Sequence, residues 1–197
     1  MSGERVIAPL ANAASAAIAV IALLALLAAG SLAAQVLSVE ELQLLDAASR
    51  GDARRVESLI AKGARADARD ATGMPPLCHA ARLRNVELAR VLLTAGAPPN
   101  GRCPNGFTPL GYAALVGDMP LARRLLRDGA RIDEPGASGN TPLQNAVVTS
   151  HVEMVRFLLT KNPDIERLDQ NGRPPLVVAA ATGNVEVVQA LLDAGAR

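Results

Sequence analysis

The stretch NGFTPLGYAALVGD, residues 105–118, joins a tight turn to a short helix. The pair Asn105-Gly106 favours a turn because both residue types tolerate positive φ. The hydroxyl of Thr108 can cap a helix that begins at Pro109, where the missing N–H is not needed. Apolar residues follow at helical spacing, and a glycine then suits a left-handed helix end. The helix is only about two turns long and is unstable alone, so it must pack against a neighbouring segment.

The same arrangement recurs along the chain at one fixed interval in sequence, which is the number of residues that separates Pro76 from Pro109. Four positions keep this interval without exception: Pro76, Pro109, Pro142 and Pro175; Leu77, Leu110, Leu143 and Leu176; Ala80, Ala113, Ala146 and Ala179; Gly73, Gly106, Gly139 and Gly172. A further series is Gly63, Gly96, Gly129, Asn162 and Gly195, and asparagine is the usual second choice for a left-handed cap. A strict period of this length indicates stacked helical units that share one continuous core.

Four segments carry a common pattern: GMPPLCHAARLRNVELARVLLTAGA, GFTPLGYAALVGDMPLARRLLRDGA, GNTPLQNAVVTSHVEMVRFLLTKNP and GRPPLVVAAATGNVEVVQALLDAGA. The chain thereby resembles the ankyrin-repeat family, whose pattern is a turn, a Thr-Pro-Leu-His helix start, a second helix ending in Leu-Leu, and Gly-Ala. A fifth segment, LQLLDAASRGDARRVESLIAKGA, lacks the Thr-Pro, as an amino-terminal capping repeat often does. The resemblance implies an all-α ankyrin-repeat solenoid over residues 38–197, with five helix-turn-helix repeats at about 40–69, 70–102, 103–135, 136–168 and 169–197. Arg84 and Ser150 replace the family's mid-repeat glycine, which puts local hydrogen bonds in doubt.

Residues 1–37 are a different kind of chain. No charged residue occurs from Val6 through Val39, and the run Ala13–Ala34 is almost wholly apolar. That run is long enough for a helix to cross a bilayer. We expect either a signal peptide, cleaved in the small-residue stretch GSLAAQ, or an uncleaved transmembrane anchor. A helix packed on the repeats is a third alternative.

Both leading alternatives deliver the repeats across a membrane if the short amino end stays in the cytoplasm. The positive-inside rule gives little guidance, because Arg50, Arg54 and Arg55 lie at the edge of the distance over which it counts. An inverted orientation therefore stays open. Arginine outnumbers lysine 18 to 2 and alanine is abundant, as in GC-rich bacterial genomes. We expect a bacterial envelope protein facing the periplasm, either soluble after cleavage or tethered to the inner membrane by one helix.

The two cysteines bear on this localisation. Cys78 begins the first helix of the second repeat, and Cys103 lies in the turn that leads into the third. In ankyrin stacks these two positions look like neighbours across the repeat boundary, so the resemblance makes a disulfide conceivable. An even number of cysteines favours pairing in an oxidising compartment. The alternative is two independent thiols that fill small spaces.

Several function classes find no support in the sequence. His79 and His151 have no further Cys or His at metal-ligand spacing, and we expect both to be structural. No phosphate-cradling loop, serine elbow or carboxylate constellation is present, so we expect no enzyme, no cofactor, no metal and no small-molecule substrate. A net charge of +1 with no Trp, one Tyr and two Phe argues against a nucleic-acid partner.

The function class that remains is binding of a protein partner. In ankyrin proteins partners usually lie along the concave face, which is made of the turn tips and the exposed positions of the first helices. Carried over residue by residue, this face includes an apolar patch with a polar rim: Met74, Arg82, Leu83, Phe107, Tyr112, Leu115, Val116, Val148 and Arg173. Such a patch on a protein surface commonly marks an interface. Phe107 is the strongest candidate of the patch, because a phenylalanine at a turn tip lies far from the hydrophobic core. For Leu115, Val116 and Val148 the alternative is that they fold back into the stack.

We therefore expect a noncatalytic adaptor or scaffold at the cell envelope, bound to an unidentified protein and also to the membrane if the amino-terminal helix is uncleaved. The alternatives are an accessory membrane subunit that stabilises a larger complex, and an immunity-type protein that blocks a toxin. A second contact surface is expected at the carboxy-terminal end, where some of Val177, Val178, Val187 and Val188 lack a covering repeat.

Overall fold

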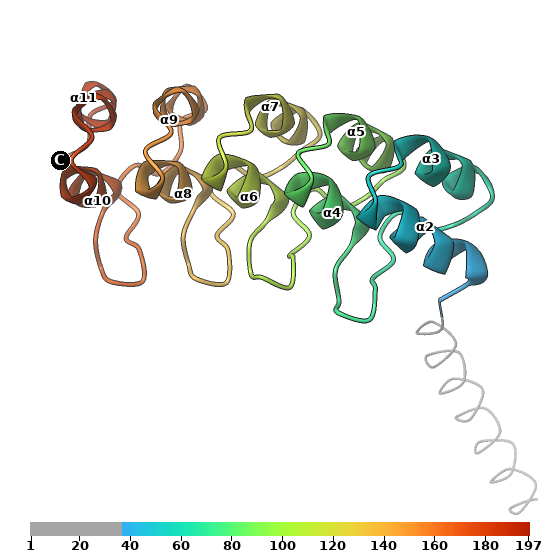
Figure 1. The fold of residues 1–197 in the computed structure, drawn as a ribbon. Helices are drawn as coiled ribbons and strands as arrows, with labels where there is room; N and C mark the ends of the chain where they lie inside the picture. Colours follow the sequence, from blue (N-terminus) through green and yellow to red (C-terminus); the bar gives the residue numbers. More distant parts are fainter. Residues whose placement is uncertain (1–36) are drawn as a thin grey trace, which may run out of the picture. The chain divides into compact units, whose positions relative to one another are not determined.

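The computed structural model describes residues 37–197, and every regular element in that range is an α-helix. The helices are α2 (Val39–Ser49), α3 (Ala53–Ala61), α4 (Pro76–Arg82), α5 (Val86–Thr94), α6 (Pro109–Leu115), α7 (Met119–Arg127), α8 (Pro142–Val148), α9 (Val152–Leu159), α10 (Pro175–Thr182) and α11 (Val185–Asp193). They follow one another as antiparallel pairs, so the predicted all-α solenoid of five helix-turn-helix repeats is confirmed (Figure 1).

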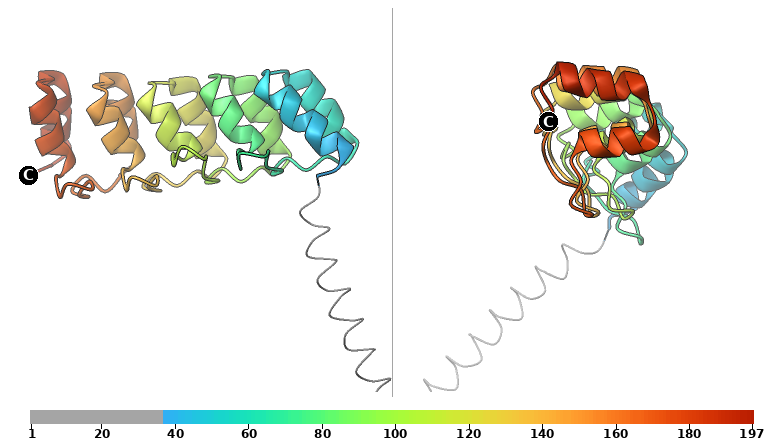
Figure 2. Two further views of the ribbon diagram at one scale, coloured as in Figure 1. Left: turned by 60° about the horizontal axis from the view of Figure 1, so that its bottom comes forward. Right: turned by 90° about the vertical axis from the view of Figure 1, so that its left-hand side faces the viewer.

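The pairs form two layers. The first helices of the pairs, α2, α4, α6, α8 and α10, lie side by side in one layer, and α3, α5, α7, α9 and α11 form the other (Figure 1). Viewed along the stack, the layers superpose from repeat to repeat, and the long turns all project on the same side (Figure 2). The predicted signal peptide or anchor falls almost entirely on residues outside the described range. Within residues 37–197 no helix has the length and apolar character needed to span a membrane.

The first helices begin as the opening stretch predicts. The N–H of Gly111 donates to Thr108 Oγ1 at 3.0 Å, and Pro109 occupies the first helical turn. In the next repeat Thr141 and Gln144 form a reciprocal capping box, in which each side chain accepts a hydrogen bond from the other residue's backbone N–H. These caps satisfy backbone donors that helices of seven residues would otherwise leave without partners.

The two departures from the mid-repeat glycine do not break the turns. Arg84 and Ser150 adopt left-handed backbone angles, with φ of 54° and 56°. The N–H of His151 still donates to Ala146 O at 3.0 Å, so the closing hydrogen bond is kept as in the repeat that has Gly117. The local hydrogen bond is therefore kept at Ser150. The left-handed backbone angles of Arg84 and Ser150 are strained, because both residues carry a Cβ atom.

One core runs through all five repeats. The periodic leucines Leu77, Leu110 and Leu143 are at most 2% exposed. The periodic alanines Ala80, Ala113, Ala146 and Ala179 are fully buried. Alanine at these positions allows helices of adjacent repeats to approach closely, which explains a core with few aromatic side chains.

Candidate protein-binding surface

Each turn tip is closed by the same backbone hydrogen bond. The N–H of the first tip residue donates to the carbonyl oxygen four residues later, at 2.9 to 3.1 Å. The first residues of the four tips are Asp70, Cys103, Gly136 and Asp169. The tips therefore share one backbone shape, although the side chain at the first position differs.

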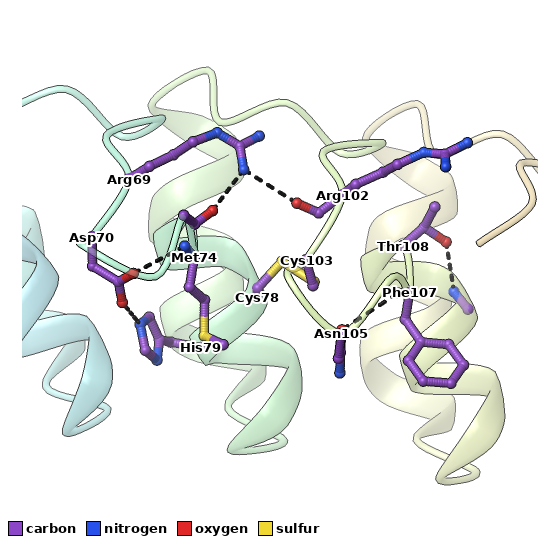
Figure 3. Close-up of a disulfide and its surroundings, with 12 residues drawn as sticks. Arg69, Asp70, Met74, Cys78, His79, Arg102, Cys103, Asn105, Phe107 and Thr108 are labelled. Atoms are coloured by element: carbon purple, nitrogen blue, oxygen red, sulfur yellow. Dashed lines mark hydrogen bonds and ion pairs between the residues drawn. A yellow bond between two sulfur atoms is a disulfide. The ribbon is translucent and has the colours of Figure 1, made fainter. Parts of the chain in front are cut away.

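Asp70 holds the first tip together through its carboxylate. Its Oδ1 accepts hydrogen bonds from the N–H of Thr72 at 2.8 Å, from Thr72 Oγ1 at 2.6 Å and from the N–H of Met74 at 3.0 Å. Its Oδ2 lies 3.3 Å from Nε2 of His79, which extends from α4 (Figure 3). Burial alone would raise the pKa of Asp70, but the hydrogen bonds from Thr72, Met74 and His79 together hold this pKa below its ordinary value.

His79 has the structural role expected from the sequence. Its side chain is buried, and burial lowers its pKa against the opposing effect of the Asp70 hydrogen bond. Arg82, a predicted binding residue, is exposed, and its Nη2 lies 3.4 Å from Nδ1 of His79. A neutral imidazole thus joins the tip to α4.

Asp169 repeats this arrangement in the last tip. Its Oδ1 accepts from the N–H groups of Asn171 and Arg173 at 2.8 and 2.9 Å, and its Oδ2 accepts from the Arg173 guanidinium at 3.0 and 2.8 Å. The backbone hydrogen bond from Arg173 and its guanidinium lower the pKa of Asp169 to about 2, despite desolvation of the carboxylate. Arg173, which the sequence assigned to the partner-binding rim, is therefore already paired within the chain.

The second tip has a disulfide in place of the aspartate. Cys103 is bonded to Cys78 in α4, with 1.96 Å between the sulfurs and 5.7 Å between the Cα atoms (Figure 3). The sequence left this pairing open, and neither cysteine of the chain is free in the structure. Arg69 adds a second tie, because its Nη1 donates to the carbonyl oxygens of Gly73 and Arg102 at 2.8 and 3.3 Å.

The second and third tips are joined through their backbones. The N–H of Ala137 donates to Gly106 O at 2.6 Å. A Cβ atom at Gly136 would lie 2.8 Å from the same carbonyl oxygen, closer than side chains approach backbone. The contact between the tips thus explains why the third tip begins with glycine instead of aspartate.

The predicted patch falls into two rows on adjacent repeats. Met74 and Phe107 occupy equivalent positions of two tips, and Leu115 and Val148 occupy equivalent positions at the ends of α6 and α8. Val148 is 49% exposed and Leu83, at the end of α4, is 42% exposed. The other apolar members, Met74, Phe107, Leu115 and Val116, are half-buried, as is Tyr112.

Phe107 finds a partner that the sequence did not suggest. Its ring meets the ring of Tyr112 edge to face, with centroids 6.2 Å apart and an angle of 81° between the planes. The phenylalanine is therefore partly covered by α6, and the pair forms a fixed aromatic ridge beside the tip. Val148 and Leu83 are the apolar side chains of the patch that protrude furthest.

His151 also has a structural place. Its Nε2 lies 3.1 Å from Leu115 O in the preceding repeat, and Asn85, at the equivalent position of the second repeat, also reaches back one repeat and donates to Gly51 O at 2.9 Å. Within residues 37–197 no group of three or more His, Cys, Asp or Glu side chains is placed to hold a metal ion.

Comparison with known families agrees with this architecture. A family model described as ankyrin repeats, three copies, matches residues 44–136 and 116–197. A search of curated proteins found no match. Ankyrin repeats are protein-interaction modules and are generally noncatalytic. Since the two matches together span well over half of the sequence, the chain belongs to the ankyrin-repeat family.

Proposed function

We propose that this protein is a noncatalytic adaptor or scaffold that binds one partner protein on its concave face. The observation that carries the proposal is a set of apolar side chains on three successive first helices and tips: Leu83 and Val148 are exposed at the ends of α4 and α8, and Phe107 and Tyr112 form the aromatic ridge of the repeat between them. Exposed apolar and aromatic side chains are typical of the centre of a protein interface.

The platform beneath this patch is rigid. The disulfide ties α4 to the second tip, and Arg69 bridges Gly73 O of the first tip and Arg102 O next to the second. The Ala137 hydrogen bond ties the second tip to the third. A surface that is ordered before binding loses less conformational entropy when the partner docks. Three adjacent repeats therefore present the patch as one preorganised unit.

The proposed location is the bacterial cell envelope, with the repeats in the periplasm. The Cys78–Cys103 disulfide supports this location because structural disulfides persist in oxidising compartments and are rare in the cytosol. The uncharged run from Val6 to Val39 supplies the export signal or the anchor. We propose that the disulfide forms after export and then fixes the second tip to α4.

A second candidate function is an accessory membrane subunit that uses the end of the stack. Val185 and Leu192 of α11 are 77% and 47% exposed, and Val177 of α10 is 48% exposed. Leu93, equivalent to Leu192, is only 9% exposed because the next repeat covers it. Of the four valines expected at this end, Val178 and Val187 are buried and the other two are not, so the contact surface is smaller than the full set.

A crosslinked pull-down from native membranes separates these functions. The concave-face variant is Leu83→Lys, Val148→Lys, and the matched variant of equal charge is Val185→Lys, Leu192→Lys. All four side chains are exposed, so both variants are expected to fold, which circular dichroism checks. Loss of one specific partner in the concave-face variant alone supports the adaptor. Loss in the end variant alone supports the accessory subunit, and retention in both contradicts both proposals.

A further inference from the structure

A groove of about 670 Å³ is lined by residues of α7, of α9 and of the segments that follow them. Both helices belong to the layer away from the turn tips (Figure 1). The apolar lining of the groove comes from Leu126, Ala130, Ile132 and Phe157. Its charged lining comes from Arg123, Arg127 and Lys161. The volume is in the range of clefts that bind small molecules or a few residues of a peptide. No carboxylate is among the described residues that line it.

Two of the cations are held in place by the aromatic ring. The guanidinium carbon of Arg123 lies 4.4 Å from the centroid of Phe157, and Nζ of Lys161 lies 5.5 Å from it. Phe157 is only 9% exposed, so its ring is a fixed floor. A guanidinium stacked on a ring keeps its in-plane N–H groups free to donate to a carboxylate. Arg123 is thereby oriented before any ligand arrives.

The groove cations differ from other arginines of the outer layer. Arg90 is paired with Glu87, Arg124 with Asp128, and Arg156 with both Glu153 and Glu186. Arg123, Arg127 and Lys161, by contrast, make no ion pair with any described residue. Three unpaired cations around an apolar hollow concentrate a positive potential there.

The repeat register shows how the groove arises. Stacking also forms hollows between α3 and α5, of about 230 Å³, and between α9 and α11, of about 390 Å³. Both of these contain a carboxylate, Glu57 in the first and Asp193 in the second. At the α9 wall of the larger groove, Phe157 and Lys161 take the positions that Arg124 and Asp128 hold in the preceding repeat. An ion pair in one repeat is thus replaced by a ring and an unpaired lysine in the next.

We propose that this groove binds a short acidic segment of a partner protein, in which an aliphatic side chain enters the hollow and carboxylates on either side meet the cations. Arg123 and Arg127 lie one helical turn apart on α7, and Lys161 follows α9 on the opposite wall. A ligand in the groove can therefore place carboxylates against cations on both walls. An anionic membrane surface fits less well, because the exposed carboxylates Glu87, Glu153 and Glu186 offset the charge of Arg90 and Arg156, so the outer layer around the groove is not uniformly cationic.

The test uses the full-length protein in neutral detergent micelles and a fluorescein-labelled peptide of sequence ELELEE, with QLQLQQ as the uncharged control. Binding is followed by fluorescence anisotropy. We expect the acidic peptide to bind, the neutral peptide to bind about tenfold or more weakly, and added salt to weaken the acidic complex.

The groove variant is Arg123→Glu, Lys161→Glu, and the matched control is Arg54→Glu, Lys62→Glu, which reverses one arginine and one lysine on the exposed surface of the first repeat. We expect the groove variant to weaken binding about tenfold or more and the control to change it less than about twofold. Phe157→Leu keeps an apolar floor and is expected to weaken binding severalfold, because Arg123 loses its stacking surface.

Three results with the peptides and variants would overturn the proposal: no binding of the acidic peptide, equal binding of both peptides, or an equal loss in the two charge-reversal variants. Addition of phosphatidylglycerol to the micelles tests the membrane alternative. Full displacement of the bound peptide by this lipid at low mole fraction would assign the groove to an anionic lipid surface instead of a peptide.

Discussion

At the scale of single residues, the first positions of the four turn tips stabilise the same backbone shape through different side chains. Asp70 and Asp169 close their tips with carboxylate hydrogen bonds, Cys103 does so through a disulfide, and Gly136 makes room for a neighbouring carbonyl. Equivalent positions therefore solve the same problem with different chemistry. What they share is the backbone hydrogen bond that sets the shape of the tip.

Asp169 is expected to make stability depend on pH in the acid range. Its pKa is about 2 in the folded protein and 3.8 ordinarily, so folding favours the charged form. Its stabilising contribution is complete above the ordinary pKa and disappears as the pH falls through that value toward 2. We predict that Asp169→Asn lowers the urea midpoint at pH 7, and that the difference from the unaltered protein shrinks steadily below pH 4. A difference that does not change with pH would contradict this role.

Ser150 is expected to be a site where glycine stabilises the protein. Its φ of 56° lies in the left-handed region, which costs a side chain more than it costs glycine. Glycine loses more entropy on folding, so part of the gain is offset. We predict that Ser150→Gly raises the free energy of unfolding by about 0.5 to 1 kcal/mol in urea titrations. Ser138→Gly, at an exposed tip residue whose φ is not positive, serves as the control and should not stabilise.

At the scale of elements, seven-residue helices persist because threonine caps hold their amino-terminal ends and backbone hydrogen bonds, such as that from the N–H of Asp118 to Ala113 O, hold their carboxy-terminal ends. The disulfide belongs to this level, since it joins α4 of one repeat to the turn before α6 of the next. It therefore restrains the boundary between two repeats, where a solenoid is most easily opened.

Removal of the disulfide is expected to destabilise the middle of the stack. It closes a loop of 25 residues, and the chain-entropy estimate for a loop of that length is about 3.5 kcal/mol. We predict that Cys78→Ala, Cys103→Ala lowers the free energy of unfolding by about 2 to 4 kcal/mol. Hydrogen exchange should show that the variant exchanges faster than the oxidised protein, and that this increase is larger in residues 70–108 than in α10 and α11. Uniform protection equal to that of the oxidised protein would contradict this.

The sequence predicted the helices and turns better than it predicted the contacts between side chains. The fixed repeat period determined the helices, their caps and the left-handed exits, because these depend on a few neighbouring residues. The Phe107–Tyr112 pair and the Arg173–Asp169 pair were not foreseen, since both depend on how a tip folds back on its own repeat. The sequence nevertheless held a signal for the tips in the spacing from Asp70 to Gly73, which recurs from Asp169 to Gly172.

The groove shows the same limit. The repeat pattern alone does not show that Arg123, Arg127, Phe157 and Lys161 lie around one groove. Their contacts join two repeats, so they become visible only when the repeats are superposed and departures are compared position by position. That comparison would have shown a ring and a lysine where the preceding repeat has an arginine and an aspartate.

At the scale of the whole repeat domain, two surfaces of opposite character lie on opposite layers. The concave face is apolar and aromatic, whereas the groove between α7 and α9 is cationic. Both involve the third and fourth repeats, so the two proposed binding sites do not compete for the same surface.

The most direct test of the central claim is site-specific photocrosslinking in living cells. A photoreactive phenylalanine analogue is placed at Val148 on the concave face, and at Glu57 on the outer helix α3 as the control. Both side chains are exposed, so neither replacement disturbs the core. The account predicts one discrete crosslinked protein from position 148, lost when Leu83 is replaced by Lys, and none from position 57. Crosslinks from position 57 alone, or from neither position, would contradict binding on the concave face.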